Sequence, residues 1–259
     1  MTQLWALRLE YDGTPFVGWQ RQINGPSVQQ VLEEAAAKLN AGNPVASIAA
    51  GRTDAGVHAA GQVVQLTLPA GFTPDRLREA LNFHLKPHPV SVVQAALAPD
   101  GWNARFSAIS RLYRYRILNR RARPALDANR VWHVSKPLDA TAMHRAAQHL
   151  LGRHDFTSFR AAACQAKSPI RTLDQLDVTR LGDDIEITAQ ARSFLHHQVR
   201  NMAGSLKLVG QGAWPEARIA QALAVQDRAA AGPTAPPYGL TLLRVGYAID
   251  PFADAGCFA

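Results

Sequence analysis

The sequence predicts an α+β protein whose strands pair largely antiparallel. Strand-like and helix-like segments are mixed along the chain without the strict alternation of a parallel α/β sheet. Apolar residues make up 47% of the 259 residues and charged residues 19%, a balance that excludes wholesale disorder. The turn at 181–184 separates two strand-like runs and indicates an antiparallel hairpin. A chain of this length has room for one large core or two smaller ones.

The first half of the chain, residues 1–104, is predicted to form an N-terminal α/β subdomain. It opens with a strand over residues 4–11 that ends in the turn Asp12–Pro15. A helix follows, with Ser27 as N-cap and Gln30 completing a capping box. The remaining elements are strands at 45–50, 61–68 and 87–98 and a helix that starts at Thr73 and Pro74.

The second half, residues 105–259, is predicted to form a C-terminal α/β subdomain after a crossover at 99–107. One helix is signalled by the apolar face Leu195, Val199, Met202, Leu206 and Val209, with Gly210 expected as its cap. The other elements are a strand at 110–118, a helix at 140–151, the hairpin strands 171–179 and 185–191, a shorter helix from Pro215 and a closing strand at 239–247. We find no sequence repeat between the halves.

The charge of the chain points to an anionic partner. Lys and Arg number 28 against 20 Asp and Glu, which gives a net charge of +8 and a pI near 10.0. Six arginines lie between residues 111 and 123, interleaved with Tyr113 and Tyr115. Cationic forks beside aromatic faces suit unstacked nucleotides, so nucleic acid is favoured over an acidic protein or a membrane surface.

Several classes of protein are disfavoured. No apolar run approaches the length of a membrane span, and no secretory signal precedes the first strand. Two cysteines, Cys164 and Cys257, are too few for a disulfide framework or a cysteine-rich zinc module, and we expect Cys164 to be packed in the interior. No phosphate-binding GxxxxGK[ST] loop and no nucleophile elbow occur. We therefore expect a soluble cytoplasmic protein without a nucleotide cofactor.

The segment Gly51–His58 is the first candidate for chemistry. Glycines at 51 and 56 let the backbone bend on either side of Asp54. Arg52, two residues earlier, is placed to reach a phosphate or enter a base stack while Asp54 works on a base. An ordinary turn with an exposed arginine is the alternative interpretation.

The segment Phe194–Asn201 is the second candidate. His196 and His197 are adjacent and lack the i, i+4 spacing of a helical metal pair, which argues against a metal site. An arginine such as Arg200 near a recessed carboxylate would stabilise its ionised form and lower its pKa. The alternative is a surface arginine at a helix flank.

Seven segments in this order resemble the tRNA pseudouridine synthase A family, over residues 10 to about 245. The octapeptide that ends in His58 is the most specific, and Leu112 departs from the basic residue that the family often carries there. The segments are Glu10–Gly13, Phe16–Gln22, Ala50–His58, Ala104–Ser107, Tyr113–Tyr115, Asp155–Phe159 and Phe194–Asn201.

The resemblance implies isomerisation of uridine to pseudouridine at positions 38, 39 and/or 40 of the tRNA anticodon stem-loop. It implies a homodimer that uses no cofactor and no metal. It also implies two α/β subdomains that share a central, largely antiparallel sheet, with a catalytic cleft between them.

Residue roles follow from the same resemblance. Asp54 is implied as the catalytic carboxylate, Arg52 as the group that fills the space of the extruded uridine, and Tyr113 as the ring that stacks on the target base. Arg200 is implied to pair with Asp54, and Leu240 to help pack the uracil. Further RNA contacts are expected from Arg21, Arg105, Arg111, Arg114, His58 and Arg160.

Two other functions stay open at this point. A non-catalytic RNA-binding protein or RNA chaperone explains the charge, although a carboxylate in a basic loop would weaken phosphate binding. A hydrolytic nuclease would use His58, His196 or His197 together with Asp54.

Overall fold

The computed structural model describes residues 1–253, and these fold into two compact units. One unit comprises Met1–Ile109 and the chain from Leu242 onward, and the other comprises Ser110–Thr241. The last strand therefore belongs mostly to the first unit, whereas the sequence analysis grouped it with residues 105–259. Cys257 lies outside the described residues. No helix among the described residues is long and apolar enough to cross a membrane.

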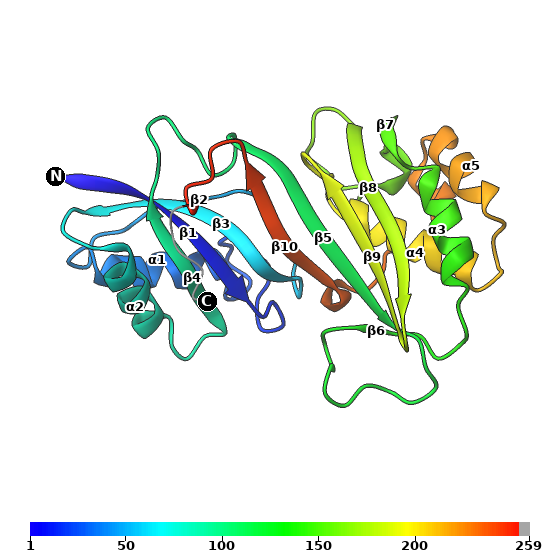
Figure 1. Cartoon of the computed structure of the whole chain (residues 1–259), viewed down its shortest axis with the longest axis horizontal. Coiled ribbons are helices and arrows are strands. Elements are labelled where there is room, and N and C mark those ends of the chain that lie inside the picture. The colour runs from blue at the N-terminus through cyan, green and yellow to red at the C-terminus, as the bar shows by residue number, and fades with distance from the viewer. Residues whose placement is uncertain (254–259) are drawn as a thin grey trace. The chain divides into compact units, whose positions relative to one another are not determined.

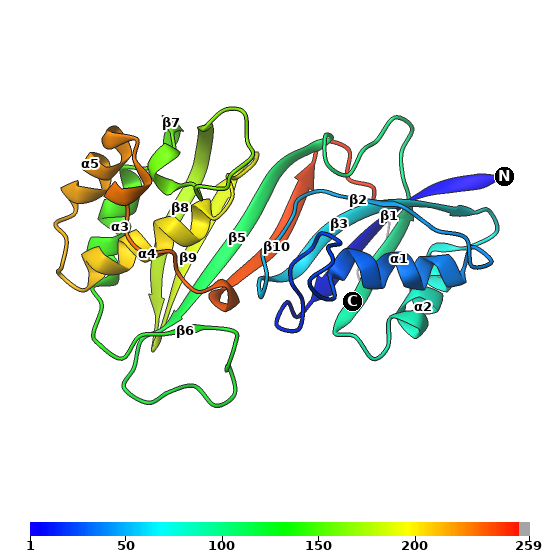
Figure 2. The same ribbon diagram turned by 180° about the vertical axis from the view of Figure 1, so that it is seen from behind.

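The first unit is a sheet with two helices on one side (Figures 1 and 2). The strand order is β4-β1-β3-β10, with β2 also beside β3, and β1 pairs antiparallel with both β3 and β4. Trp5, Leu7 and Leu9 of β1 are fully buried. The elements are β1 (Thr2–Tyr11), α1 (Val28–Lys38), β2 (Ser47–Ala49), β3 (His58–Pro69), α2 (Pro74–Leu85), β4 (Val90–Leu97) and β10 (Leu240–Tyr247).

The second unit is also a sheet with its helices on one side, as Figure 2 shows. The strand order is β5-β9-β8-β7, all antiparallel, with β6 parallel to β5. The elements are β5 (Ala108–Leu118), β6 (Trp132–His133), α3 (Ala140–Gln148), β7 (Gly152–Asp155), β8 (Ile170–Leu181), β9 (Asp184–Ala191), α4 (Gln198–Gly210) and α5 (Ala217–Val225), with short 3-10 helices at Thr157–Phe159, Arg228–Ala230 and Pro237–Gly239.

The α+β class and the antiparallel pairing are confirmed, as are several local signals. Ser27 Oγ accepts a hydrogen bond from Gln30 N at 3.2 Å at the start of α1. Thr73 caps α2 in the same way, with Pro74 as its first residue. The expected hairpin is β8 and β9.

Other boundaries are corrected by the structure. The helix expected to include Leu195 begins at Gln198, because His197 has a φ of +62° and breaks the helical path. Gly210 is the last residue of α4 and not a cap beyond it. The helix expected at 140–151 ends at Gln148. Cys164 is half-buried in the loop before β8, not packed in the interior.

Gly204→Ala tests how closely the segment 231–236 lies against α4. A Cβ at position 204 would come within 1.7 Å of the Pro233 carbonyl oxygen, which is backbone and cannot swing away. We expect the substitution to lower the free energy of unfolding by about 1–3 kcal/mol, although alanine is the better helix former by about 1 kcal/mol. Urea unfolding measures the change.

Gly210→Ala is the matched control, in the same helix. Its Cβ would meet the flexible end of Met143, with Sδ at 2.6 Å, so a smaller loss is expected. If Gly204→Ala proved as stable as the parent chain, the close packing of residue 204 against Pro233 would be wrong.

Candidate active site loop and its counterpart in the second unit

The loop that carries Asp54 connects β2 to β3 and is paired with the segment that follows β1. Asp54 forms an isolated antiparallel bridge with Gly18. Trp19 N donates to the Thr53 carbonyl at 2.9 Å, and Gly56 N donates to the Phe16 carbonyl at 3.4 Å. Loops are mobile unless other groups hold them, and here backbone contacts hold both sides of Asp54. The half-buried Asp54 is thus a carboxylate on a fixed backbone.

Gly13 explains how the two segments approach so closely. A Cβ at this position would lie 2.0 Å from the Val57 carbonyl oxygen, which only glycine avoids. Gly13 N donates to His58 Nδ1 at 3.0 Å, and this ring nitrogen lies 3.2 Å from Asp12 Oδ1. The His58 ring is buried and its Nδ1 joins β3 to the Asp12–Gly13 turn. Its predicted RNA contact stays a prediction.

Polar side chains beneath the loop are also satisfied. The Tyr11 hydroxyl and Thr53 Oγ1 are 2.8 Å apart and buried. Burial raises the pKa of Tyr11 to about 12, against an ordinary 10.0, although hydrogen bonds to Thr53 and Gln62 favour the ionised form. Gln62 Nε2, fully buried, donates to the Gly51 carbonyl at 2.8 Å. The sequence analysis assigned no role to Thr53 or Gln62.

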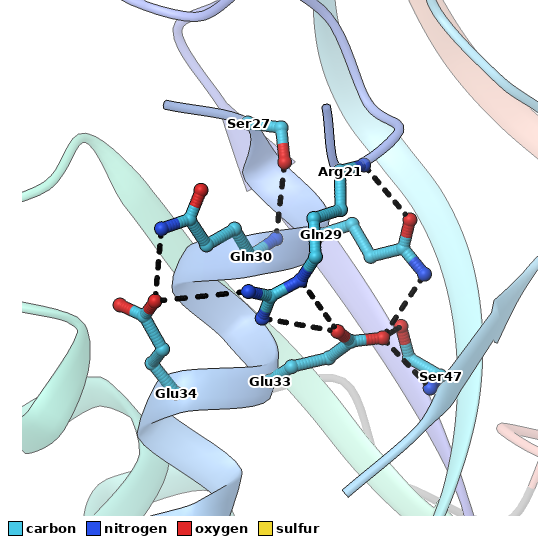
Figure 3. A network of polar contacts seen from close by, with 7 residues as sticks. All are labelled: Arg21, Ser27, Gln29, Gln30, Glu33, Glu34 and Ser47. Carbon is cyan, nitrogen blue, oxygen red and sulfur yellow. Dashed lines mark hydrogen bonds and ion pairs between the residues drawn. The ribbon is translucent and has the colours of Figure 1, made fainter. Parts of the chain in front are cut away.

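Arg52 and Arg21 differ in what surrounds them. Arg52 is exposed on the Asp54 loop. Arg21 is bound to α1: its Nε donates to Glu33 Oε2 at 3.3 Å, and Nη1 lies 4.0 Å from Glu34 (Figure 3). Glu33 in turn accepts from Ser47 Oγ at 2.9 Å. The network holds the start of β2 and the loop after Trp19 against α1, so Arg21 has a structural role whether or not it contacts RNA.

In the second unit, Tyr113 lies on β5 opposite Ala189 of β9. Its ring meets the ring of Phe194 edge to face, with centroids 5.3 Å apart and planes at 89°. This geometry is the favourable one for aromatic pairs and fixes the plane of the Tyr113 ring.

Arg200, in the first turn of α4, is held by the segment 231–236. Its Nε donates to the Ala235 carbonyl at 2.8 Å, and Ala235 N donates to the Arg200 carbonyl at 3.1 Å. The Tyr115 hydroxyl donates to the next carbonyl, that of Pro236, at 2.8 Å. Leu240, buried, begins β10 shortly afterwards.

Arg228 and Asn201 organise the segment 231–236, and the sequence analysis assigned neither a role. Arg228 Nη1 donates to the Gly232 carbonyl at 3.0 Å, and Nη2 donates to Asn201 Oδ1 at 3.2 Å and Thr234 Oγ1 at 3.1 Å. Asn201, fully buried, donates from Nδ2 to the Phe159 carbonyl at 2.8 Å. The contacts of Asn201 leave no local signal in the sequence, because Arg228 and Phe159 lie 27 and 42 residues away from it.

The arginines of β5 are largely engaged within the second unit. Arg111 Nη1 donates to the Arg192 carbonyl. Arg114 lies 3.3 Å from Glu186, and Arg116 lies 2.6 Å from Asp184, both on β9. The sequence analysis treated this run as phosphate-binding groups, whereas Arg114 and Arg116 face carboxylates of the neighbouring strand. The other two expected RNA contacts, Arg105 and Arg160, are exposed and half-buried respectively.

The candidate residues therefore divide between the units. Asp54, Arg52 and His58 belong to one loop and strand of the first, and Tyr113, Arg200 and Leu240 to the second.

Tyr11→Phe tests the buried hydroxyl under the Asp54 loop. Because the pKa of Tyr11 is raised to about 12 in the folded chain, the stability that its neutral form contributes is fully present below pH 10. It is lost as the pH rises from 10 toward 12. In Tyr11→Phe the fall of the unfolding free energy with pH should be shallower there by up to about 1.4 kcal/mol per pH unit.

Urea unfolding between pH 8 and 11.5 measures this difference. Thr53→Val, which keeps the buried tyrosine and removes its partner, should retain the steep fall. If the unfolding free energy fell equally steeply with pH in Tyr11→Phe and in the parent chain, the raised pKa of Tyr11 would be contradicted.

Comparison with known proteins places these segments in a family. The sequence model of tRNA pseudouridine synthase matches residues 9–107 and 146–248, which include the Asp54 loop, Arg200 and Leu240. A protein of Acidiphilium cryptum (strain JF-5) named tRNA pseudouridine synthase A is 67% identical over 249 residues, covering 96% of this chain and 98% of the relative. A protein of the same name from Gluconobacter oxydans (strain 621H) is 58% identical, covering 96% of this chain and 91% of the relative. Another from Rhodospirillum centenum (strain ATCC 51521 / SW) is 59% identical, covering 95% of this chain and 100% of the relative. The chain belongs to the tRNA pseudouridine synthase family.

Proposed function

We propose that this enzyme isomerises uridine to pseudouridine at position 38, 39 and/or 40 of the tRNA anticodon stem-loop, with Asp54 as the catalytic carboxylate. Membership of the family supports tRNA pseudouridylation itself. The position of the target uridine and the role of Asp54 are the parts that we add. We further propose that the enzyme acts as a homodimer in the cytoplasm.

The observation that carries the proposal is the fixed backbone of the Asp54 loop. Asp54 is bridged to Gly18, and its neighbours Thr53 and Gly56 bond Trp19 and Phe16. Holding a reacting group in place removes much of the entropic cost of reaching the transition state. A carboxylate displayed on such a loop suits chemistry better than phosphate binding, which its charge opposes.

The reaction needs no external electrons and no activated donor. The bond between the sugar C1′ and uracil N1 breaks, a C1′–C5 bond forms, the C5 proton leaves and N1 gains a proton. The product has the mass of the substrate. Asp54 acts in its ionised form, by attack on C1′, by addition to the uracil ring, or by removal of a sugar proton. Each of these routes needs the target uridine held close to the Asp54 carboxylate.

The target uridine must leave its stack before this chemistry, at a cost of a few kcal/mol. We propose that Arg52, exposed beside Asp54, takes the space that the base vacates. Tyr113, oriented by Phe194, would stack on the flipped base, and Leu240 would pack the uracil. Arg200, held by Ala235, would pair with Asp54.

Asp54→Asn tests the catalytic role. Release of tritium from 5-tritiated uridine in unmodified tRNA should fall by at least about 10³-fold, since the base or nucleophile is lost. Binding of the tRNA should stay close to that of the parent chain. Asp100→Asn, an exposed carboxylate of the same unit, is the matched control and should release tritium normally.

Mapping of carbodiimide-reactive uridine isomers in the treated tRNA locates the modified positions. Normal tritium release by Asp54→Asn would remove Asp54 from the chemistry. Reactive isomers outside positions 38–40 would overturn the proposed target, and shortened tRNA would indicate a nuclease.

Arg228→Met tests whether the segment 231–236 positions Arg200. The substitution removes four hydrogen bonds to this segment and Asn201 at similar side-chain length. We expect kcat to fall on the order of tenfold to a hundredfold, with a smaller change in KM, because a small misplacement of a catalytic group is costly.

Arg218→Met is the control, because Arg218 lies on α5 over the Trp214 ring and its hydrogen bond goes to the carbonyl of Ala230, before the segment. Unfolding midpoints are measured beside the rates. An unchanged kcat in Arg228→Met, or equal losses in both variants, would contradict the positioning role.

A further inference from the structure

A hollow of about 210 Å³ lies in the second unit where β7 and β8 begin and β9 ends. Arg153 of β7 lies opposite Thr172 of β8, and Arg192 comes directly after Ala191, which pairs with Leu173. Neighbouring strands are about 4.8 Å apart, so side chains from these positions reach a common space. The lining residues are Arg153, Ile170, Arg171, Thr172, Arg192 and Ser193.

The lining of the hollow is cationic and contains no carboxylate. Arg153 and Arg192 are exposed, and neither they nor Arg171 form an ion pair with any described residue. The arginines on β5 behave differently, because Arg114 and Arg116 meet carboxylates of β9. Positive charge left without a counter-charge in a concave site attracts an anion.

Arg171 adds a donor that the protein does not satisfy. Its Nη1 donates to the carbonyls of Ser168 at 3.0 Å and Ile170 at 2.6 Å, which fixes the guanidinium. Its Nε is buried and has no hydrogen-bond partner. Burial also lowers the pKa of Arg171. The hydroxyls of Thr172 and Ser193 provide further donors at the same place.

We propose that this hollow binds a phosphodiester of the tRNA backbone. Arginine forks bind two phosphate oxygens at once, and the exposed forks of Arg153 and Arg192 together with the Thr172 hydroxyl match the acceptors of a phosphate group. The inference rests on the proposed tRNA substrate, and it adds a contact that fixes the strand beside the flipped base.

The path of the chain favours an RNA phosphate over a free anion. Arg111 holds the carbonyl of Arg192, and two residues later Phe194 contacts Tyr113. The same short segment thus lines the hollow and orients the ring proposed to stack on uracil.

The double variant Arg153→Ala/Arg192→Ala tests the site, with Arg76→Ala, an exposed arginine on α2, as control. Binding of unmodified tRNA transcript is measured by filter binding across a salt series. The slope of log K against log[salt] should become less steep by about 2 in the double variant, about 1 for each arginine that no longer neutralises a phosphate. Arg153→Lys/Arg192→Lys should keep the slope but bind more weakly, since the charge stays and the planar forks are gone. Arg76→Ala should change neither.

Calorimetric titration of the parent chain with inorganic phosphate separates the two sources of the anion. Weak phosphate binding that competes with tRNA and disappears in the double variant supports the proposal. An unchanged tRNA salt slope in the double variant would overturn the proposal. If phosphate binding disappeared in that variant while the tRNA salt slope stayed unchanged, the hollow would be assigned to a free anion. If the parent chain neither bound tRNA nor released tritium, the proposed function itself would fail. Normal tritium release with an unchanged salt slope in the double variant would overturn only the phosphate site.

Discussion

The contact between the Asp54 loop and the segment after β1 is the constraint on which the first unit's candidate site depends. Gly13 lets the two backbones meet, the Gly18–Asp54 bridge aligns them, and the buried pair of Tyr11 and Thr53 closes the space beneath. Each of these contacts joins the Asp54 loop to β1 or to the segment that follows it. The proposed catalytic carboxylate of Asp54 is therefore placed on a loop that is held like one strand of a pair.

In the second unit, an irregular segment and not a strand is held in place beside the candidate residue Arg200. Residues 231–236 have neither helix nor sheet to hold them, so their carbonyls are bound by side chains of Arg228 and Tyr115 and by Arg200 itself. The fully buried Asn201 joins this segment to the carbonyl of Phe159 and ties three remote parts of the chain together. Buried polar networks of this kind are costly when incomplete and rigid when satisfied.

The arginines of this basic chain fall into groups with different tasks. Arg21 and Arg116 meet carboxylates and hold neighbouring elements together. Arg228 binds backbone carbonyls. Arg52, Arg153 and Arg192 are exposed and available to an external anion. The count of 28 Lys and Arg residues thus overstates the number of groups free for RNA, since an arginine paired with a carboxylate offers a phosphate much less.

The sequence by itself determined the α+β class, the capped starts of α1 and α2 and the β8–β9 hairpin, because these depend on periodicity and on groups three or four residues apart. It also singled out the Asp54 loop, through two glycines beside a carboxylate. Only the tertiary structure decided that α4 begins after a left-handed His197, that Arg114 is neutralised by Glu186, and that Arg228 supports the segment next to Arg200. The Arg114–Glu186 and Arg228–Asn201 contacts join residues tens of positions apart, and an interaction of that kind leaves no periodic or local pattern in the sequence.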